Sequence, residues 1–593
     1  MHMHVARLLM ASTMLGAVPA TAQIVPPKIY STTPTGVNLA DSAFTYSTTD
    51  IAIGPLKLER FYIGSYLNDP NKMFFGMHTS TNFDIYVARR FRSVGRYVYT
   101  VYLGASQGGM YDIGSPNPIE SNLDSRRATL EIVGGNFVYT DAAGTIYTFT
   151  ASVPALDSGG GVMASSQRIA SITYPDGRIQ SFSYNTSRQL KLVSDTSGYA
   201  IVLDYGANGR ISAACGFNLS RTYVTASSTC GGATMKAGYG YSGDQLISFT
   251  DVTNQTATYG WGGMPGWQGG ITCVKPSGYA NCKIANTYSS VLQIGSQTLA
   301  DGTVWTYASN AEPGIITDDG QAIDSDGQIN GGVMDPDGKS FGGTFTRSSP
   351  YSFTDANGQT TQYRYTGASD FFSNNPPGGP LAEGSYLVEA TYPEGNKYLA
   401  EYNGPYRAIS KETLVAKPGS GLPNLVKQYG YYFSGAPYTI TRQNAAKPAM
   451  IVDPSGNQTD YTYATHGGTL SEMQPAPSAG AARPLKLYSY VQGYAYVKNA
   501  GGALVASGAP IWLPSSETLC QTYAGSSTAT CDPAAPITTT AYEYGASGTA
   551  DNLLLRGAVV SSGGVSLRTC YGYDEYANKI FETKPRAGLA SCS

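Results

Sequence analysis

A glycine recurs seven residues before a tyrosine along this chain, and this spacing constrains the fold more than any other feature. Two copies of one phrase show it clearly, TDANGQTTQYRY at residues 354–365 and VDPSGNQTDYTY at residues 452–463. Such internal repetition predicts an array of similar units. The pairs with this spacing are Gly177 and Tyr184, Gly198 and Tyr205, Gly358 and Tyr365, Gly395 and Tyr402, and Gly456 and Tyr463, with Asn254 and Trp261 as a degenerate case.

Each unit reads as a strand, a turn, a second strand and a second turn. In the Asp-x-x-Gly turn the aspartate can hydrogen-bond the backbone two residues ahead, and the glycine takes a positive φ at low cost. Side chains alternate along the following strand, so the residues five and seven positions after the glycine share a face. We therefore expect Tyr363 to lie beside Tyr365, and Tyr461 beside Tyr463.

The composition favours one large β-structure. The 593 residues include 70 glycines and 46 tyrosines, and only 13% are charged, against about 25% in typical globular domains. Tyrosine suits a half-buried pleated surface and glycine suits turns, whereas no stretch keeps a helical period. The predicted fold is all-β, with repeated antiparallel β-hairpins forming a curved sheet, strip or partial shell. Residues 23–155 are predicted to form an N-terminal β region, and residues 156–593 a hairpin array interrupted by polar insertions.

Residues 1–22 have the layout of a secretory signal peptide. Arg7 precedes an apolar run from Leu8 to Val18, and a small-x-small cleavage site ends at Ala22. No later run reaches the about 20 apolar residues of a transmembrane helix. We expect the protein to be secreted, periplasmic or at the cell surface after cleavage near Ala22.

The eight cysteines are close neighbours in pairs, and an even count in a secreted chain favours disulfides. Local pairing would close loops of roughly ten to twenty residues, each contributing about 2–4 kcal/mol. A metal site is disfavoured, because no close pair has C-x-x-C spacing and the mature chain keeps only His78 and His466 as imidazole ligands. The candidate pairs are Cys215 with Cys230, Cys273 with Cys282, Cys520 with Cys531, and Cys570 with Cys592.

A Tyr-Asp step with an Asn turn, Tyr573-Asp574 in CYGYDEYANKIFETKP, accompanies the Asp-x-x-Gly units. The segment VNLADSAFTYSTTDIAIGPLKLERFY at residues 37–62 stands ahead of them. With these motifs the chain resembles the RHS, or YD-repeat, proteins. The resemblance implies a β-hairpin array that spirals into a shell or strip, which in better-known members encloses a C-terminal toxin or contributes to cell-surface contacts.

Full-length members of that family carry a core with self-cleaving aspartates near the end of the shell, followed by a variable effector. Here DPDGK and DPSGN stand mid-chain in ordinary turn contexts. We therefore expect no autoproteolytic site and no effector, and repeats too few and too interrupted to close a complete shell. The expected partner is a separately encoded RHS core or effector, or a glycan of the cell envelope.

Enzymatic signatures are missing from the sequence: it has no G-x-S-x-G elbow, H-E-x-x-H, phosphate loop or dinucleotide fingerprint. We expect no enzyme, no catalytic residue and no cofactor, with His78 and His466 in structural roles. A net charge of −3 gives no basic footprint for nucleic acid. Asp324, Asp326, Asp335 and Asp337 form an oxygen-rich group that suits either calcium or two Asp-x-Asp-Gly turns, but Ile329 stands where an EF-hand needs glycine.

The sequence therefore predicts a secreted, non-enzymatic scaffold or shell fragment, with a role in toxin encapsulation, toxin delivery or cell-surface contact. The alternative is a carbohydrate-binding adhesin that stacks surface tyrosines on sugars, although tyrosines in strands more often face a core. A polysaccharide-acting enzyme is the least favoured hypothesis.

Overall fold

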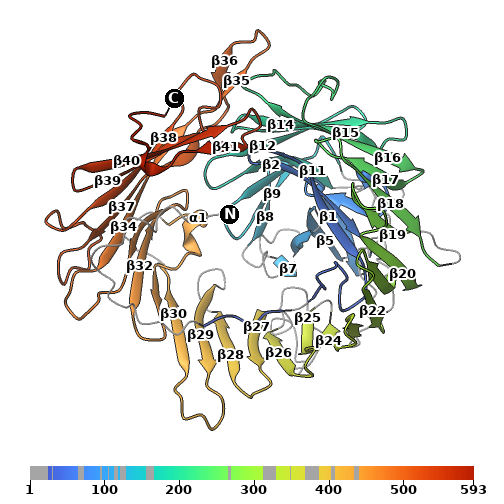
Figure 1. Cartoon of the computed structure of the whole chain (residues 1–593), viewed down its shortest axis with the longest axis horizontal. Coiled ribbons are helices and arrows are strands. Elements are labelled where there is room, and N and C mark those ends of the chain that lie inside the picture. Colours follow the sequence, from blue (N-terminus) through green and yellow to red (C-terminus); the bar gives the residue numbers. More distant parts are fainter. Residues whose placement is uncertain are drawn as a thin grey trace.

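A computed structural model describes residues 24–592 except 30, 65–72, 94–95, 105, 113–117, 121–127, 155–165, 265–268, 312–328, 347–348, 367–385, 403–407 and 433–439. The signal peptide predicted at residues 1–22 lies outside the described residues. The predicted fold class is confirmed, because antiparallel strands dominate and form a curved sheet. Figure 1 shows these strands following one another around a ring, with N-terminal strands toward the inside. No helix in the described part of the chain has the length and apolar character needed to cross a membrane.

The wall of the ring is a ladder in which nearly every strand pairs antiparallel with the next one in the chain. Its strands are β11 (Gln167–Thr173), β12 (Ile179–Tyr184), β13 (Leu190–Asp195), β14 (Tyr199–Tyr205), β15 (Ile211–Asn218), β16 (Lys236–Ser242), β17 (Gln245–Thr250), β18 (Thr256–Gly262), β19 (Gly270–Lys275), β20 (Ile284–Ser290), β21 (Gln293–Leu299), β22 (Val304–Ser309), β23 (Ile329–Met334), β24 (Ser340–Thr346), β25 (Ser349–Thr354), β26 (Thr360–Thr366), β27 (Tyr386–Thr391), β28 (Lys397–Tyr402), β29 (Ile409–Val415), β30 (Leu425–Gly430), β31 (Met450–Val452), β32 (Gln458–Tyr463), β33 (Thr469–Met473), β34 (Pro484–Gly493), β37 (Ile511–Gln521), β38 (Thr538–Tyr544), β39 (Leu555–Ser562), β40 (Val565–Tyr573) and β41 (Lys579–Glu582).

A small hairpin, β35 (Tyr496–Lys498) with β36 (Leu504–Ala506), leaves the ladder between β34 and β37. The one-turn helix α1 (Arg442–Ala445) follows β30, and 3-10 turns occur at Met73–Phe75 and Pro585–Ala587. Among the described residues, β40 is the only strand that pairs with β41. The ring is therefore not closed by strand pairing.

The N-terminal region contributes one separate sheet and two branches of the ladder. The separate sheet, here called the inner sheet, consists of β1 (Thr45–Ile53), β2 (Leu56–Ile63) and β3 (Thr79–Thr81). One branch is β4 (Ile85–Ser93), β5 (Arg96–Leu103), β6 (Ser106–Asp112) and β7 (Pro118–Glu120); the other is β8 (Thr129–Val133), β9 (Asn136–Thr140) and β10 (Ile146–Thr150). Both branches join at β11, which pairs with β10 along one edge and with β4 and then β12 along the other.

The repeated glycines occupy the turns for the reason that their spacing predicts. Each lies in the left-handed region: φ is +89° at Gly177, +100° at Gly198, +78° at Gly358, +84° at Gly395 and +82° at Gly456. Within the turn, the aspartate accepts backbone N–H groups: Asp453 Oδ1 accepts those of Ser455 at 2.8 Å and Asn457 at 2.9 Å. Asp574 of the Tyr-Asp step does the same for Tyr576 and Asn578.

The tyrosine seven residues after the glycine stands opposite a β-bulge. Tyr205 pairs with Ile211 while Asp204 pairs with Ala213, so Ser212 is an extra residue in β15. The first residue of such a bulge turns its carbonyl toward the next unit along the ladder, where an aromatic side chain donates a hydrogen bond to it. Tyr205 reaches the carbonyl of Leu190 in this way, at 2.7 Å.

This aromatic-to-bulge hydrogen bond recurs at intervals between β11 and β38. Among the residues that the structure describes, nine bulge carbonyls accept it, at residues 169, 190, 211, 246, 271, 387, 409, 469 and 514. The donors are Tyr184, Tyr205, Tyr241, Trp261, Tyr288, Tyr402, Tyr431, Tyr490 and Tyr544, over 2.6 to 3.0 Å. Tyr463 makes a similar bond to the carbonyl of Pro448. The spacing in the sequence thus places an aromatic donor where the bulge leaves a backbone acceptor.

Candidate functional site

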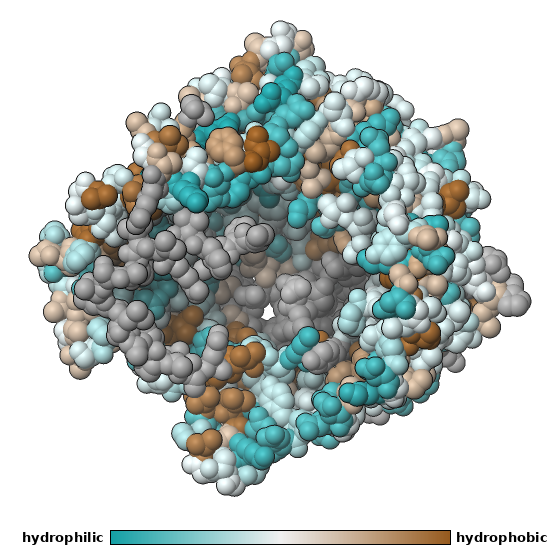
Figure 2. Space-filling model, viewed as in Figure 1, coloured by the Kyte–Doolittle hydropathy of each residue, from teal (hydrophilic) through white to brown (hydrophobic). Residues whose placement is uncertain are grey.

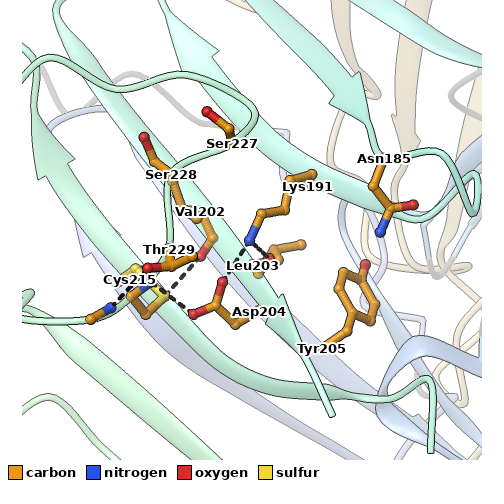
Figure 3. Close-up of polar contacts among 12 residues, drawn as sticks. Asn185, Lys191, Val202, Leu203, Asp204, Tyr205, Cys215, Ser227, Ser228 and Thr229 are labelled. Carbon is orange, nitrogen blue, oxygen red and sulfur yellow. Dashed lines mark hydrogen bonds and ion pairs between the residues drawn. A yellow bond between two sulfur atoms is a disulfide. The ribbon is translucent and has the colours of Figure 1, made fainter. Parts of the chain in front are cut away.

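The cysteines pair with their neighbours in sequence, with Cα–Cα distances of 5.4 to 5.7 Å. Cys215 and Cys230 pin the insertion between β15 and β16 onto one face of the ladder (Figure 3). Asp204 holds this insertion as well, because its carboxylate accepts the N–H of Cys230 at 2.7 Å and pairs with Lys191 at 2.5 Å. These contacts lie on the outer face, opposite to Leu203 and Tyr205 of the same strand.

Both histidines of the mature chain are packed against aromatic rings. His78 is 7% exposed, lies at φ +54° and meets Tyr62 edge to face. His466 stacks on Trp512 with ring centroids 4.7 Å apart and meets the edge of Tyr490. Burial lowers the pKa of His466, and the nearby Lys447 lowers it further.

Of the four aspartates considered for calcium, the structure describes only Asp335 and Asp337. Asp324 and Asp326 lie outside the described residues. Asp335 shapes its own turn, since its Oδ1 accepts the N–H groups of Asp337 at 3.0 Å and Lys339 at 2.8 Å. Within the described ranges, no group of three or more His, Cys, Asp or Glu side chains is arranged to hold a metal ion.

A buried ion pair joins the inner sheet to the wall. Arg60 of β2 donates to Asp50 of β1 at 2.9 Å and to the hydroxyl of Tyr259 in β18 at 3.1 Å, while Tyr239 in β16 donates to Asp50 at 3.0 Å. Burial disfavours the charge on Arg60, but the adjacent Asp50 carboxylate outweighs it and raises the arginine pKa. Its guanidinium also lies 5.1 Å from the ring of Phe249. Arg60 and Asp50 both lie in the segment 37–62 that stands ahead of the repeats, but nothing in the sequence predicts that they pair.

The inner sheet packs on β14, β15 and β16, and the segments on either side of β3 extend this cover over the inner face of the first part of the ladder. Phe182 meets Phe83 edge to face with centroids 5.9 Å apart, and Tyr239 meets Phe75 in the same way at 4.7 Å. Phe182 and Tyr239 are 7% and 9% exposed. Over this part, the strand aromatics form the core that the sequence predicts for them.

The same inner face continues through strand register into the last third of the ladder. Tyr363 donates to the carbonyl of Lys28 at 3.2 Å, which places its side chain on the inner side. The strand pairing places Tyr363, Tyr398 and Glu412 on the same face of the sheet. Glu412 is a buried carboxylate that accepts hydrogen bonds from the hydroxyls of Tyr398 and Tyr429. Tyr461 follows on β32 and stacks beside Tyr463, as expected, with centroids 6.3 Å apart.

Beyond this point, partly exposed tyrosines and carboxylates alternate across the strands. Tyr461 faces Glu472, Tyr488 faces Glu517, and Tyr571 faces Glu582 in register. Partial burial raises the pKa of Tyr488 to about 12, with a further contribution from Glu517. We call this surface the tyrosine face, and its members are Tyr461, Tyr488, Tyr542, Tyr571, Glu472, Glu517 and Glu582. Figure 2 shows the molecule hollowed near the centre of this view.

Comparison with known proteins finds no matching family model and no matching curated protein. Similar solved structures include a Photorhabdus luminescens Tc holotoxin pore with a mutated TccC3, at 12% identity and a TM-score of 0.26, covering 86% of this chain and 28% of that chain. The crystal structure of TcdB2-TccC3 is similar at 11% identity and a TM-score of 0.27, covering 86% and 29%. The chain thus spans less than a third of the chains that it matches. Likeness at this level carries no conclusion on function.

Proposed function

We propose that the protein is a secreted, non-enzymatic RHS/YD-repeat scaffold whose tyrosine face holds a polypeptide partner, in the manner of a shell fragment. One observation carries this proposal. The inner face is covered at Phe182 and Tyr239 by the segments that flank β3, and it remains partly exposed at Tyr461, Tyr488, Tyr542 and Tyr571. A wall that covers only part of its aromatic inner face leaves the rest available to another chain.

The chemistry of the tyrosine face suits a polypeptide with apolar and basic side chains. Tyrosine rings supply large apolar area, and they attract cations at their faces. Glu517 and Glu472 stand beside Tyr488 and give basic side chains an ion-pair partner. The non-enzymatic part of the proposal rests on the packing of the two histidines and on the turn aspartates that are occupied by backbone N–H groups.

The exposed edge of β41 supports a partner that continues the ladder. Lys579 is the first residue of a bulge opposite Tyr573, the position whose carbonyl accepts an aromatic donor at nine other bulges. Ile580 is 64% exposed and Phe581 is 50% exposed. Because an edge strand offers unpaired backbone groups to another strand, a hairpin of a separately encoded RHS core would fit here, with an aromatic side chain over Lys579.

The tyrosine face is tested with a permanently unfolded polypeptide. Fluorescently labelled, reduced and carboxymethylated α-lactalbumin is titrated with the mature protein, and binding is followed by anisotropy. The variant Tyr488→Ser/Tyr542→Ser/Tyr571→Ser should bind at least tenfold more weakly than the wild type. The control Tyr223→Ser/Tyr523→Ser removes two tyrosines that are 48% and 50% exposed elsewhere, and should bind normally. Equal binding by both variants, or no binding by the wild type, refutes the proposed role.

A second candidate function, glycan binding at the cell surface, is favoured by one groove. It has a volume of about 760 Å³ and lies between the inner sheet and β20–β21, and its lining includes Tyr46, Phe61, Tyr279, Lys283 and Asp301. Aromatic rings beside charged groups suit a sugar that stacks and hydrogen-bonds. A glycan array probed with the mature protein tests this, and Tyr279→Ala should abolish any signal that arises in the groove. If the protein binds none of the arrayed glycans, the adhesin hypothesis is wrong.

A further inference from the structure

The last strands of the ladder return to the first ones, and loops and side chains join the two ends there. We call this contact the seam; Figure 1 shows β14 and β15 close to the hairpin β35–β36 and to β41. Asn218 Nδ2 donates to Asp551 Oδ1 at 2.6 Å and to the carbonyl of Glu575 at 2.7 Å. The N–H of Trp512 donates to the carbonyl of Asp176 at 2.7 Å. Residues more than 300 positions apart thus close a ring that strand pairing leaves open.

A cavity of about 360 Å³ lies within the seam. Its lining combines Asp176, Arg178 and Ser197 from the first strands and turns with Tyr496, Asp551 and Asn552 from the last ones. Cavities that bind small molecules begin at about this size. Both ends of the ladder therefore contribute to one partly open cavity.

Asn552, one of the residues that line this cavity, has a side-chain acceptor without a donor. The residue is 6% exposed, and its Nδ2 donates to the carbonyl of Tyr494 at 2.9 Å. Its Oδ1 is buried and finds no hydrogen-bond partner among the described residues. Buried polar atoms are nearly always paired in folded proteins. The site therefore requires a hydrogen-bond donor that this part of the chain does not supply.

The charges around the cavity disfavour ions of either sign. Arg178 pairs with Asp195 at 2.8 Å, and Arg221 pairs with Asp551 at 3.1 Å. An anion would meet the carboxylates of Asp176 and Asp551, and a cation would meet the guanidinium of Arg178. A neutral ligand rich in hydroxyl groups avoids both penalties, and its hydroxyls can donate to Asn552 Oδ1 and to the carboxylates.

The remaining lining residues give the cavity an apolar wall. Tyr199 and Ile511 are 4% and 5% exposed, and Leu513 and Leu553 line the cavity beside them. A pyranose presents an apolar C–H face together with a rim of hydroxyl donors, and its size suits a cavity of this volume. We propose that the seam binds a neutral, polyhydroxylated small molecule of monosaccharide size. Because the ligand contacts both ends of the ladder, its binding stabilises the closed ring by mass action.

The proposal is tested by titrating the full mature protein with D-glucose, D-galactose, N-acetyl-D-glucosamine and myo-inositol, each followed by calorimetry and thermal unfolding. Ethanolamine and acetate represent a cation and an anion. At least one polyol should bind and raise the midpoint of unfolding, while neither ion does so. Failure of all four polyols to bind, or binding of an ion without any polyol, overturns the proposal.

Variants separate this site from other sugar contacts. Asn552→Leu removes the unpaired acceptor and should weaken binding at least tenfold. Ser197→Ala removes a cavity hydroxyl that bonds Asp195 at 2.6 Å, and it should also weaken binding. Thr253→Ala is its matched control, because Thr253 makes the same contact with Asp251 at 2.7 Å in an exposed turn that does not line the cavity. Unchanged binding in both Asn552→Leu and Ser197→Ala overturns the assignment. The triple variant of the tyrosine face should keep polyol binding, so this site and the proposed function fail or succeed separately.

Discussion

Removing one tyrosine hydroxyl tests whether the aromatic-to-bulge bonds stabilise the ladder. Tyr205→Phe keeps the ring but removes the donor that lies 2.7 Å from the carbonyl of Leu190. Burial raises the pKa of Tyr205 well above its ordinary value, so the hydroxyl is neutral and able to donate at pH 7. Leu190 is 4% exposed, and its carbonyl would lose this partner. Leaving a buried acceptor unsatisfied costs about 1–3 kcal/mol.

The repeat contains its own control for this change. Tyr365 occupies the same position seven residues after Gly358, opposite a bulge, yet its buried hydroxyl finds no hydrogen-bond partner among the described residues. Tyr365→Phe therefore removes an unsatisfied hydroxyl and should be neutral or slightly stabilising. Tyr402→Phe, which removes a bond of 3.0 Å to Leu387, should behave like Tyr205→Phe.

Hydrogen exchange is the suitable measurement, because a protein of this size need not unfold in one cooperative step. Amides of β13 and β14 report the local opening free energy near Tyr205. At about 1.4 kcal/mol for each factor of ten, Tyr205→Phe should speed their exchange by roughly 5- to 150-fold. Amides of β26 and β27 should change little in Tyr365→Phe. Equal acceleration in both variants, or no acceleration in Tyr205→Phe, would refute a stabilising role of the hydrogen bond, because both changes keep the ring and only one removes a bond.

Three further changes follow from the contacts described above. Arg60→Met leaves the Asp50 carboxylate buried without its ion pair and should cost about 3–5 kcal/mol, seen as a lower unfolding midpoint; an unchanged midpoint would exclude a stabilising role for the pair. Replacing Cys215 and Cys230 by alanine should cost about 2–4 kcal/mol and increase proteolysis between β15 and β16, whereas unaltered proteolysis would contradict the pinning. The pKa of His466 is lowered in the folded protein, because burial favours the neutral imidazole. The stability that depends on neutral His466 is therefore complete above the ordinary pKa of about 6.5, and it is lost as pH falls through the lower folded value. His466→Phe should flatten the acid side of the pH–stability curve, and an unchanged slope would contradict this.

Turns, strands and disulfide partners could be predicted because each depends on residues close together in the chain. Gly456 has the positive φ that its turn requires, and Asp453 closes that turn through backbone N–H groups within four residues. Cys273 and Cys282 are nine residues apart, so their loop brings them together whatever the rest of the chain does. The predicted shared face of Tyr461 and Tyr463 follows from strand alternation in the same way.

The sequence predicted only part of what the seven-residue spacing between glycine and tyrosine does. It predicted two tyrosines on one face, but not that the second would donate to a bulge carbonyl in another strand. Tyr205 lies 15 residues after its acceptor and Tyr241 lies 30 residues after its own, because an insertion intervenes between β15 and β16. Bulges leave no clear signal in composition, so this pairing emerges only when neighbouring strands are placed in register.

By itself, the sequence determined the local structure of this protein: an all-β chain of hairpins, with glycine in each tight turn and tyrosine on alternate positions of each strand. Only the tertiary structure decided which aromatic side chains are covered by the inner sheet, which remain partly exposed on the tyrosine face, and how Asn218 meets Asp551 across 333 positions. The physical reason is the separation along the chain between the residues that interact. A turn depends on backbone dihedrals and hydrogen bonds within a few residues, whereas the curvature of the ladder sums small twists over many strands before its two ends can meet.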